Sequence, residues 1–178
     1  MKIALIVLGV AIAGFLVFVA TRPDTYHVER SRKIAAPADV VFAHLDDFKA
    51  WPAWSPWEKD PNVKKTFAGP AKGVGATYSW EGNKQVGKGK ITVTRSTPPT
   101  AISYRLEFIE PFASIAAASF TLEPEGERAA TVTWSMDGHN NFAGKAISVF
   151  MNMDRMIGGE FEKGLASLES ISEAEARK

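Results

Sequence analysis

Few residues in this chain have the type and the spacing that known catalytic or metal chemistry requires. The 178 residues include no cysteine, which excludes disulfides, thiolate metal sites and cysteine nucleophiles together. The histidines, His27, His44 and His139, are scattered, without His-x-x-x-His spacing or an accompanying acidic cluster. Neither a Gly-x-Ser-x-Gly nor a complete Gly-x-Gly-x-x-Gly motif occurs. We therefore expect no metal site and no cofactor, and the sequence contains no recognised nucleophile.

Asp154 is the charged residue whose position most favours a chemical role. It lies at helical spacing from Phe150 and Ile157, so its carboxylate falls on or beside an apolar stripe. A buried carboxylate needs a partner or a raised pKa, because burial without either is costly. Asp154 could then serve as a polar anchor or a general base in a ligand tunnel. The commoner alternative is a structural ion pair at the edge of the stripe, with a sheet arginine such as Arg95 or Arg105.

Apolar side chains form a second group of candidates, for ligand binding rather than catalysis. Segment 51–57 holds three tryptophans and two prolines; it could grip a ligand or form a mouth at the bilayer, and the alternative is plain core packing. Binding pockets are mostly apolar with a few polar anchors, so the group carries more weight than any one member. The candidate ligand-binding residues are Trp51, Trp54, Trp57, Tyr78, Trp80, Tyr104, Phe120, Trp134, Met136, Phe150 and Asp154.

The N-terminal segment predicts a membrane anchor. Ile3 to Ala20 is an uninterrupted run of 18 residues without a charge or a strongly polar group. At about 1.5 Å per residue it spans roughly 27 Å, close to the hydrocarbon core of a bilayer. A cleaved signal peptide is the alternative, but cleavage after Ala20 would place bulky Phe18 where a small residue is required. We expect residues 1–22 to form an uncleaved single-pass anchor that crosses the membrane with residues 3–20.

Residues 23–178 are expected to form one folded domain. A first strand over 25–34 precedes a short helix over 38–45, and the pattern then changes to alternating strands with Gly- and Pro-rich turns. The further strands are predicted at 63–67, 76–80, 86–94, 101–109, 114–122 and 129–136. Residues 143–176 contain no proline and predict one long helix whose apolar stripe is Ile147, Phe150, Ile157, Phe161, Leu165 and Leu168.

The distribution of charge limits the classes of partner that this chain is expected to bind. The 21 basic and 20 acidic residues nearly cancel, and no run of Lys and Arg occurs, so nucleic-acid binding is not expected. Basic residues are more frequent after the apolar run than before it, which favours a cytoplasmic domain. Several of them belong to the first predicted strand, however, and both orientations stay open.

This order of elements resembles the START-like helix-grip (SRPBCC) superfamily. Two segments add to the resemblance: Trp51-Pro52-Ala53-Trp54-Ser55-Pro56-Trp57 after the first helix, and Asp154 to Gly159 in the closing helix. Within this superfamily the chain is most similar to membrane-anchored members of the polyketide cyclase/dehydrase and lipid-transport branch, over about residues 25–172. The resemblance implies an α+β helix-grip fold, in which a curved antiparallel sheet of about seven strands wraps a long C-terminal helix. It also implies a tunnel for apolar ligands under that helix. No catalytic set of the superfamily matches here residue by residue.

Three functions are compatible with these observations. The first is a membrane-tethered binding or carrier domain for a hydrophobic small molecule such as a lipid, isoprenoid, quinone or polyketide-like compound. The second is a cyclase or dehydratase that uses the same cavity, with Asp154, Tyr104 or Glu58 as its acid or base. The third is an interaction module for another membrane protein. Fold alone does not choose among them.

Overall fold

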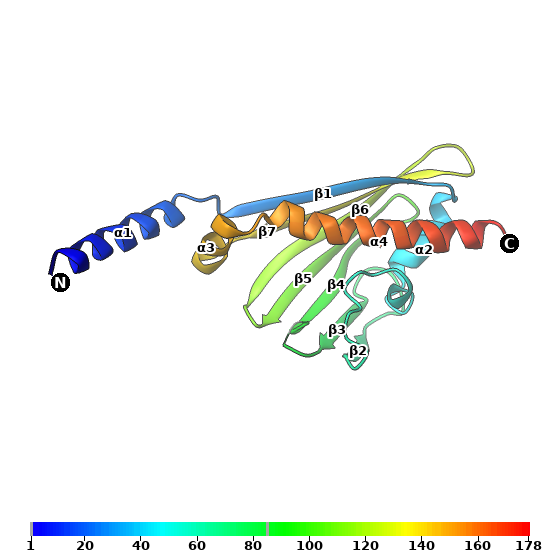
Figure 1. The fold of residues 1–178 in the computed structure, drawn as a ribbon. Helices are drawn as coiled ribbons and strands as arrows, with labels where there is room; N and C mark the ends of the chain where they lie inside the picture. The colour runs from blue at the N-terminus through cyan, green and yellow to red at the C-terminus, as the bar shows by residue number, and fades with distance from the viewer. Residues whose placement is uncertain (1, 85) are drawn as a thin grey trace.

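The computed structural model describes residues 2–84 and 86–178, and its elements follow the predicted order (Figure 1). In chain order they are α1 (Lys2–Ala20), β1 (Thr25–Ile34), α2 (Ala38–Asp46), the 3-10 helix η1 (Trp51–Ala53), β2 (Lys64–Ala68), β3 (Thr77–Glu81), β4 (Lys88–Thr97), β5 (Ala101–Glu110), β6 (Ser114–Pro124), β7 (Ala130–His139), α3 (Phe142–Phe150) and α4 (Met153–Ala176). The predicted α+β class, with a seven-stranded sheet and a long C-terminal helix, is confirmed.

The sheet is an antiparallel meander completed by the first strand. Its order is β1-β7-β6-β5-β4-β3-β2, so β2 to β7 lie beside their neighbours in sequence, as short connections favour. β1 comes before α2 in the chain and pairs with β7 along its whole length. Side chains alternate between the two faces of a strand, and this alternation decides which of them enter the core. On β5, Ile102 and Tyr104 are buried on the inner face, whereas the next residue, Arg105, points outward and is exposed.

The core lies between the inner face of the sheet and the helices α2 and α4. In Figure 1, α4 runs along β1 at one edge of the sheet, and it also packs on α2, η1 and β7. Its buried side chains follow the expected steps of three and four residues; they include Ile157, Phe161, Leu165 and Leu168. α4 therefore covers the β1 and β7 side of the sheet and not its middle.

The C-terminal segment differs from the prediction of one helix over 143–176. Two helices occupy it, with a break at Met151 and Asn152. The Asn152 side chain accepts a hydrogen bond from the backbone N–H of Arg155 at 3.0 Å, which is an N-cap that starts α4. The prediction was wrong because apolar spacing continues across the break. Ile147 and Phe150 keep in step with the stripe of α4 but lie at the surface, with exposed fractions of 40% and 78%.

α1 leaves the domain at the end where α3 lies (Figure 1). It is long and apolar enough to cross a membrane, a test that signal sequences and core helices of soluble proteins also pass. Almost all of its side chains are exposed; Val19, near its C-terminal end, is fully buried. Residues 21–24 connect it to β1.

Candidate functional site

Aromatic side chains fill the space between η1, the sheet and the middle of α4. Trp134 of β7 stacks on Phe161 of α4, with ring centroids 4.0 Å apart and planes inclined by 9°. Its other neighbours are Phe120, stacked at 4.7 Å, and Trp54, edge-on at 5.7 Å. All four rings are at most 5% exposed. Several candidate ligand-binding residues therefore pack against one another here and form core.

Three polar tips in this aromatic cluster are satisfied by the end of α2. The indole N–H of Trp51 and the hydroxyl of Tyr104 both donate to the carbonyl oxygen of Leu45, each at 3.0 Å. The indole N–H of Trp54 donates to the carbonyl oxygen of His44 at 3.2 Å. Burial raises the pKa of Tyr104 well above its ordinary value, so its hydroxyl stays a neutral donor. These bonds tie segment 51–54 and strand β5 to the end of α2.

Trp57 differs from the other two tryptophans of its segment. Its side chain is 45% exposed, and the ammonium group of Lys59 lies 5.3 Å from the ring centroid. The expected tryptophan cluster is thus divided: Trp51 and Trp54 are core, and Trp57 lies at the surface.

The side chains on the inner face of the sheet become smaller toward the end where α3 lies. One cross-strand row there pairs Tyr26 with Gly138, Gly138 with Ala116, and Ala116 with Leu106. The neighbouring row contains Ala118 beside Met136. Small residues therefore occupy the inner face of β6 and β7 at this end, whereas Phe120 and Trp134 occupy the same strands further along. The ring of Tyr26 lies across Gly138, where an added Cβ would be 2.4 Å from it.

Partly exposed apolar side chains surround these small residues. They pack against the core without being enclosed by it. We call this set the apolar rim: Tyr26, Trp80, Leu106, Phe108 and Met153. Trp80 lies across Gly89, where an added Cβ would be 2.4 Å from its ring, and Phe108 meets Trp80 edge-on at 6.1 Å. Only Trp80 of the rim was among the sequence candidates.

Tyr78 and Glu58 form a small polar group beside the aromatic core. Burial, reinforced by the nearby carboxylate of Glu58, raises the pKa of Tyr78 to about 12. Glu58 is itself in a close ion pair with Lys65, and both side chains are mostly buried. The Glu58 carboxylate therefore has a cationic partner on β2.

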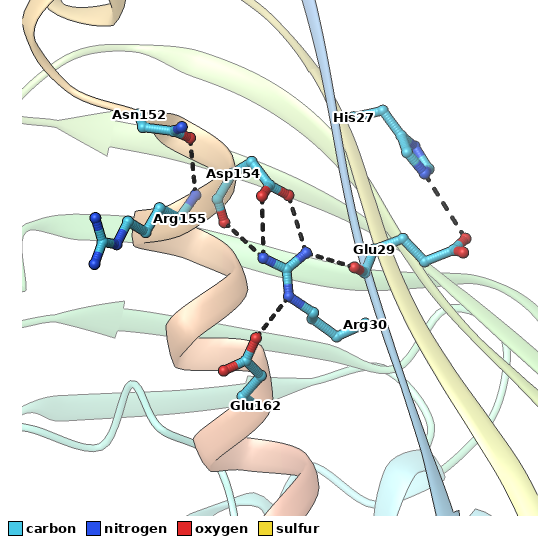
Figure 2. A network of polar contacts seen from close by, with 7 residues as sticks. All are labelled: His27, Glu29, Arg30, Asn152, Asp154, Arg155 and Glu162. Carbon is cyan, nitrogen blue, oxygen red and sulfur yellow. Dashed lines mark hydrogen bonds and ion pairs between the residues drawn. The ribbon is translucent and has the colours of Figure 1, made fainter.

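Asp154 is held by an arginine that the sequence reasoning missed (Figure 2). The guanidinium of Arg30, on β1, donates from Nη1 and Nη2 to the two carboxylate oxygens of Asp154 at 2.9 and 3.1 Å. Its Nε donates to Glu162 at 2.8 Å, two turns further along α4. This pairing holds the pKa of Asp154 below its usual range. The expected ion-pair alternative is the one observed, but the partner is Arg30 rather than Arg95 or Arg105.

Close approach of β1 and α4 makes this pairing possible. A Cβ added at Gly158 would lie 2.1 Å from a guanidinium nitrogen of Arg30, so glycine leaves the room that the arginine occupies. Alternation along β1 could have indicated Arg30, since Tyr26, Val28, Arg30 and Ile34 share the inner face. Its partners on α4 could not be read from the sequence.

The remaining candidates are widely separated. Met136 is buried between the aromatic core and the apolar rim, whereas Phe150 lies on α3 at the surface. Two surface hollows of about 220 Å³ each lie elsewhere: one is bordered by Lys64, Lys90 and Glu107 on the outer face, and the other by Phe48 and Phe67. Within residues 2–84 and 86–178, no three His, Asp or Glu side chains cluster as a metal site.

Comparison with known proteins identifies the fold and the family. Residues 25–173 match the protein family described as polyketide cyclase/dehydrase and lipid transport. Comparison with curated protein sequences finds no significant match. Norcoclaurine synthase from Thalictrum flavum has a similar structure, with a TM-score of 0.61 and 12% identity over 83% of this chain and 86% of that one.

Two further solved structures share the fold. Protein jhp0584 from Helicobacter pylori has a TM-score of 0.63 and 11% identity, over 83% of this chain and 88% of its own. The di-domain ARO/CYC protein StfQ from the steffimycin biosynthetic pathway has a TM-score of 0.63 and 11% identity, over 87% of this chain and 53% of its own. At these identities the likeness establishes the fold and not the activity.

The predicted helix-grip superfamily is therefore confirmed. The family description joins cyclases and dehydrases with lipid transport, which supports a domain that binds hydrophobic ligands. Because the match spans most of the sequence, the chain belongs to the polyketide cyclase/dehydrase and lipid-transport family.

Proposed function

We propose that this chain is a membrane-tethered domain that binds a hydrophobic small molecule, such as a lipid, isoprenoid, quinone or polyketide-like compound, at the apolar rim. The supporting observation is the change along the inner face. Large aromatic rings fill it beneath the middle of α4, whereas Ala116 and Ala118 lie between partly exposed apolar side chains at the other end, beside the ring of Tyr26 that covers Gly138. Apolar surface with few polar groups is what a hydrophobic ligand requires.

The position of the rim relative to α1 supports uptake from a membrane. Tyr26 follows α1 by six residues, and Met153 follows α3, which lies beside α1. An anchor formed by residues 1–22 would hold this end of residues 23–178 near the bilayer, where apolar ligands concentrate. The length and apolarity of α1 support that anchor.

Binding is favoured over catalysis because each nominated acid or base already has a partner. Asp154 is paired with Arg30, the Tyr104 hydroxyl donates to a backbone carbonyl, and Glu58 is paired with Lys65. A general acid or base must reach the proton that it transfers. These three groups are engaged in holding the fold.

The test uses two neighbouring alanines with opposite orientation. Ala116 is buried on the inner face of β6, and Ala117 is exposed on the outer face. The full chain is extracted in mild detergent, and native mass spectrometry measures a retained small molecule; uptake of a pyrene-labelled fatty acid is then measured after delipidation. We expect Ala116→Leu to weaken uptake at least tenfold and Ala117→Leu to leave it unchanged.

The thermal unfolding of each variant is measured as well, because extra methylenes in a packed site lower the free energy of unfolding by about 1–3 kcal/mol. Phe108→Ser, which removes a rim side chain without adding volume, should also weaken uptake, and Phe67→Ser on β2 is its matched control. Wild-type protein that retains no molecule and takes up no probe would refute the proposed function. Equal uptake by the two leucine variants would refute the site.

A further inference from the structure

α3 has its polar and apolar faces reversed relative to an ordinary surface helix. Lys145 turns toward the domain, where its ammonium group meets Asp24 at 3.1 Å and its side chain is only 15% exposed. Ser148 is partly buried and donates to the carbonyl oxygen of Lys145. Phe142, Ile147 and Phe150 point outward instead, with large exposed fractions. In water an amphipathic helix directs its apolar residues toward the core, so this arrangement indicates a different environment.

Other exposed apolar side chains lie at the same end of the domain. The turn between β5 and β6 carries Pro111 and Phe112, and Phe112 is 64% exposed. Met151, at the break between α3 and α4, is also exposed. Figure 1 shows this turn and α3 at the end of the domain from which α1 departs. We call the set Phe112, Phe142, Ile147, Phe150 and Met151 the end patch.

α1 is in direct contact with part of the end patch. The rings of Phe15 and Phe150 have centroids 6.0 Å apart, and α1 packs on α3. The connection from α1 to β1 is residues 21–24, and it is tied down because the backbone N–H of Asn140 donates to the carbonyl oxygen of Asp24 at 2.6 Å. Four residues span at most about 14 Å. A bilayer that contains α1 therefore lies within reach of the end patch.

We propose that the end patch enters the interfacial layer of the bilayer that α1 crosses, as a second membrane contact distinct from the anchor. This inference rests on the membrane anchor of the proposed function. Apolar side chains on a short surface helix, and a hairpin tip carrying Phe, match the chemistry of the boundary between headgroups and acyl chains. Arg155, exposed in the first turn of α4, adds a cation beside the patch that anionic headgroups would attract. The contact directs the apolar rim toward the membrane surface.

The absence of cysteine from the sequence gives a direct test. Single-cysteine variants of the full chain, Phe112→Cys and Phe150→Cys, are labelled with an environment-sensitive NBD dye and reconstituted in phosphatidylcholine/phosphatidylglycerol vesicles. Lipids carrying a nitroxide at a shallow or a deep acyl position then quench the dye according to its depth. Val10→Cys, in the middle of α1, reports on the anchor. Val74→Cys, an exposed valine between β2 and β3 at the other end of the strands, is the matched control.

We expect the dyes at positions 112 and 150 to be quenched at least twofold more by the shallow nitroxide than by the deep one. The dye at position 10 should show the reverse order, and the dye at position 74 should not be quenched. If position 10 is quenched while 112 and 150 behave like 74, the end patch does not meet the bilayer, although the anchor stands. If position 10 is not quenched, the anchor fails, and the second contact fails with it. The dyes at positions 112 and 150 could instead report an apolar environment that depends on the protein-to-lipid ratio, without quenching by either nitroxide lipid. That result would show a second copy of the chain on the end patch and would overturn the inference.

Discussion

Two glycines of α4 test whether the space beneath this helix is filled. Gly159 has no atom within 4 Å of an added Cβ, whereas a Cβ at Gly164 would lie 2.7 Å from Cζ3 of Trp134 and 2.9 Å from Cδ of Pro56. The perturbations are Gly164→Ala and its matched control Gly159→Ala. Both replace glycine in the interior of the same helix, so the gain in helix propensity, about 1 kcal/mol, is common to them.

The difference between the two variants therefore measures the packing conflict at Gly164. Carbon atoms in contact lie about 3.5–4.0 Å apart, so the new methyl group would overlap Trp134 by about 1 Å. Trp134 cannot yield easily, because Phe161 and Phe120 stack against its ring. Overpacking of this kind costs about 1–3 kcal/mol. We expect Gly159→Ala to stabilise the domain and Gly164→Ala to be less stable than that control by this amount.

Thermal unfolding of the full chain in detergent, followed by near-ultraviolet circular dichroism of the tryptophans, provides the assay. For a domain of this size, 1–3 kcal/mol corresponds to a difference in Tm of about 2–12 °C between the two variants. Equal increases in Tm would refute the reasoning. They would mean that Trp134 has room to move, and that the space proposed for a ligand extends beneath the middle of α4 instead of ending at the aromatic core.

Three further substitutions test individual contacts. Because Arg30 holds the pKa of Asp154 below 3.8, this pair contributes stability that is fully present above pH 3.8 and is lost as the pH falls through the lower folded value. Asp154→Asn should therefore lower the Tm at pH 7 and lower it progressively less as the pH falls below 3.8, and should leave probe uptake unchanged; weaker uptake would restore a ligand role. The bond to Asp137 raises the pKa of His27 above 6.5, so its contribution is present below pH 6.5 and is lost as the pH rises through the folded value. His27→Gln should remove that fall in Tm as the pH rises above 6.5, and an unchanged profile would contradict it. The Ser172 hydroxyl is fully buried without a hydrogen-bond partner among the described residues, so Ser172→Ala should raise the free energy of unfolding by about 1 kcal/mol in urea titrations, and a loss would indicate a bound water.

Local patterns were sufficient to predict the sheet. Period-2 alternation in 101–109 and the Pro- and Gly-rich turn after β6 are properties of neighbouring residues, and every predicted strand is present with small differences at its ends. The break between α3 and α4 was missed although its signal is local too. Asn152 is a residue type favoured at the N-cap, and its side chain accepts a hydrogen bond from the backbone N–H of Arg155. It lies within a run that otherwise keeps helical spacing.

The candidate site depends on pairs of residues that are distant in sequence, and these could not be predicted. Arg30 and Asp154 are separated by 124 positions. Whether Trp54 meets a ligand or Trp134 depends on the sheet register and on how far η1 enters the fold. Composition identified an apolar interior correctly, but it could not distinguish the end filled by large aromatic rings from the end that carries Ala116 and Gly138.

The Arg30 pairing explains why these two ends differ. Asp154 and Glu162, two turns apart on α4, both bind a guanidinium that comes from the edge strand β1, and Gly158 lets the helix approach it. The N-terminal half of α4 is thereby held along the edge of the sheet and does not cross its middle. At that end α4 does not cover Ala116 and Ala118 of β6, and the ring of Tyr26 from β1 lies across Gly138 of β7. One geometry therefore accounts for the small residues at that end, for the partly exposed rim residues around them and for the outward-facing apolar α3 beside α1. The fold is closed where α2 and α4 meet the sheet and is apolar at the end that faces α1.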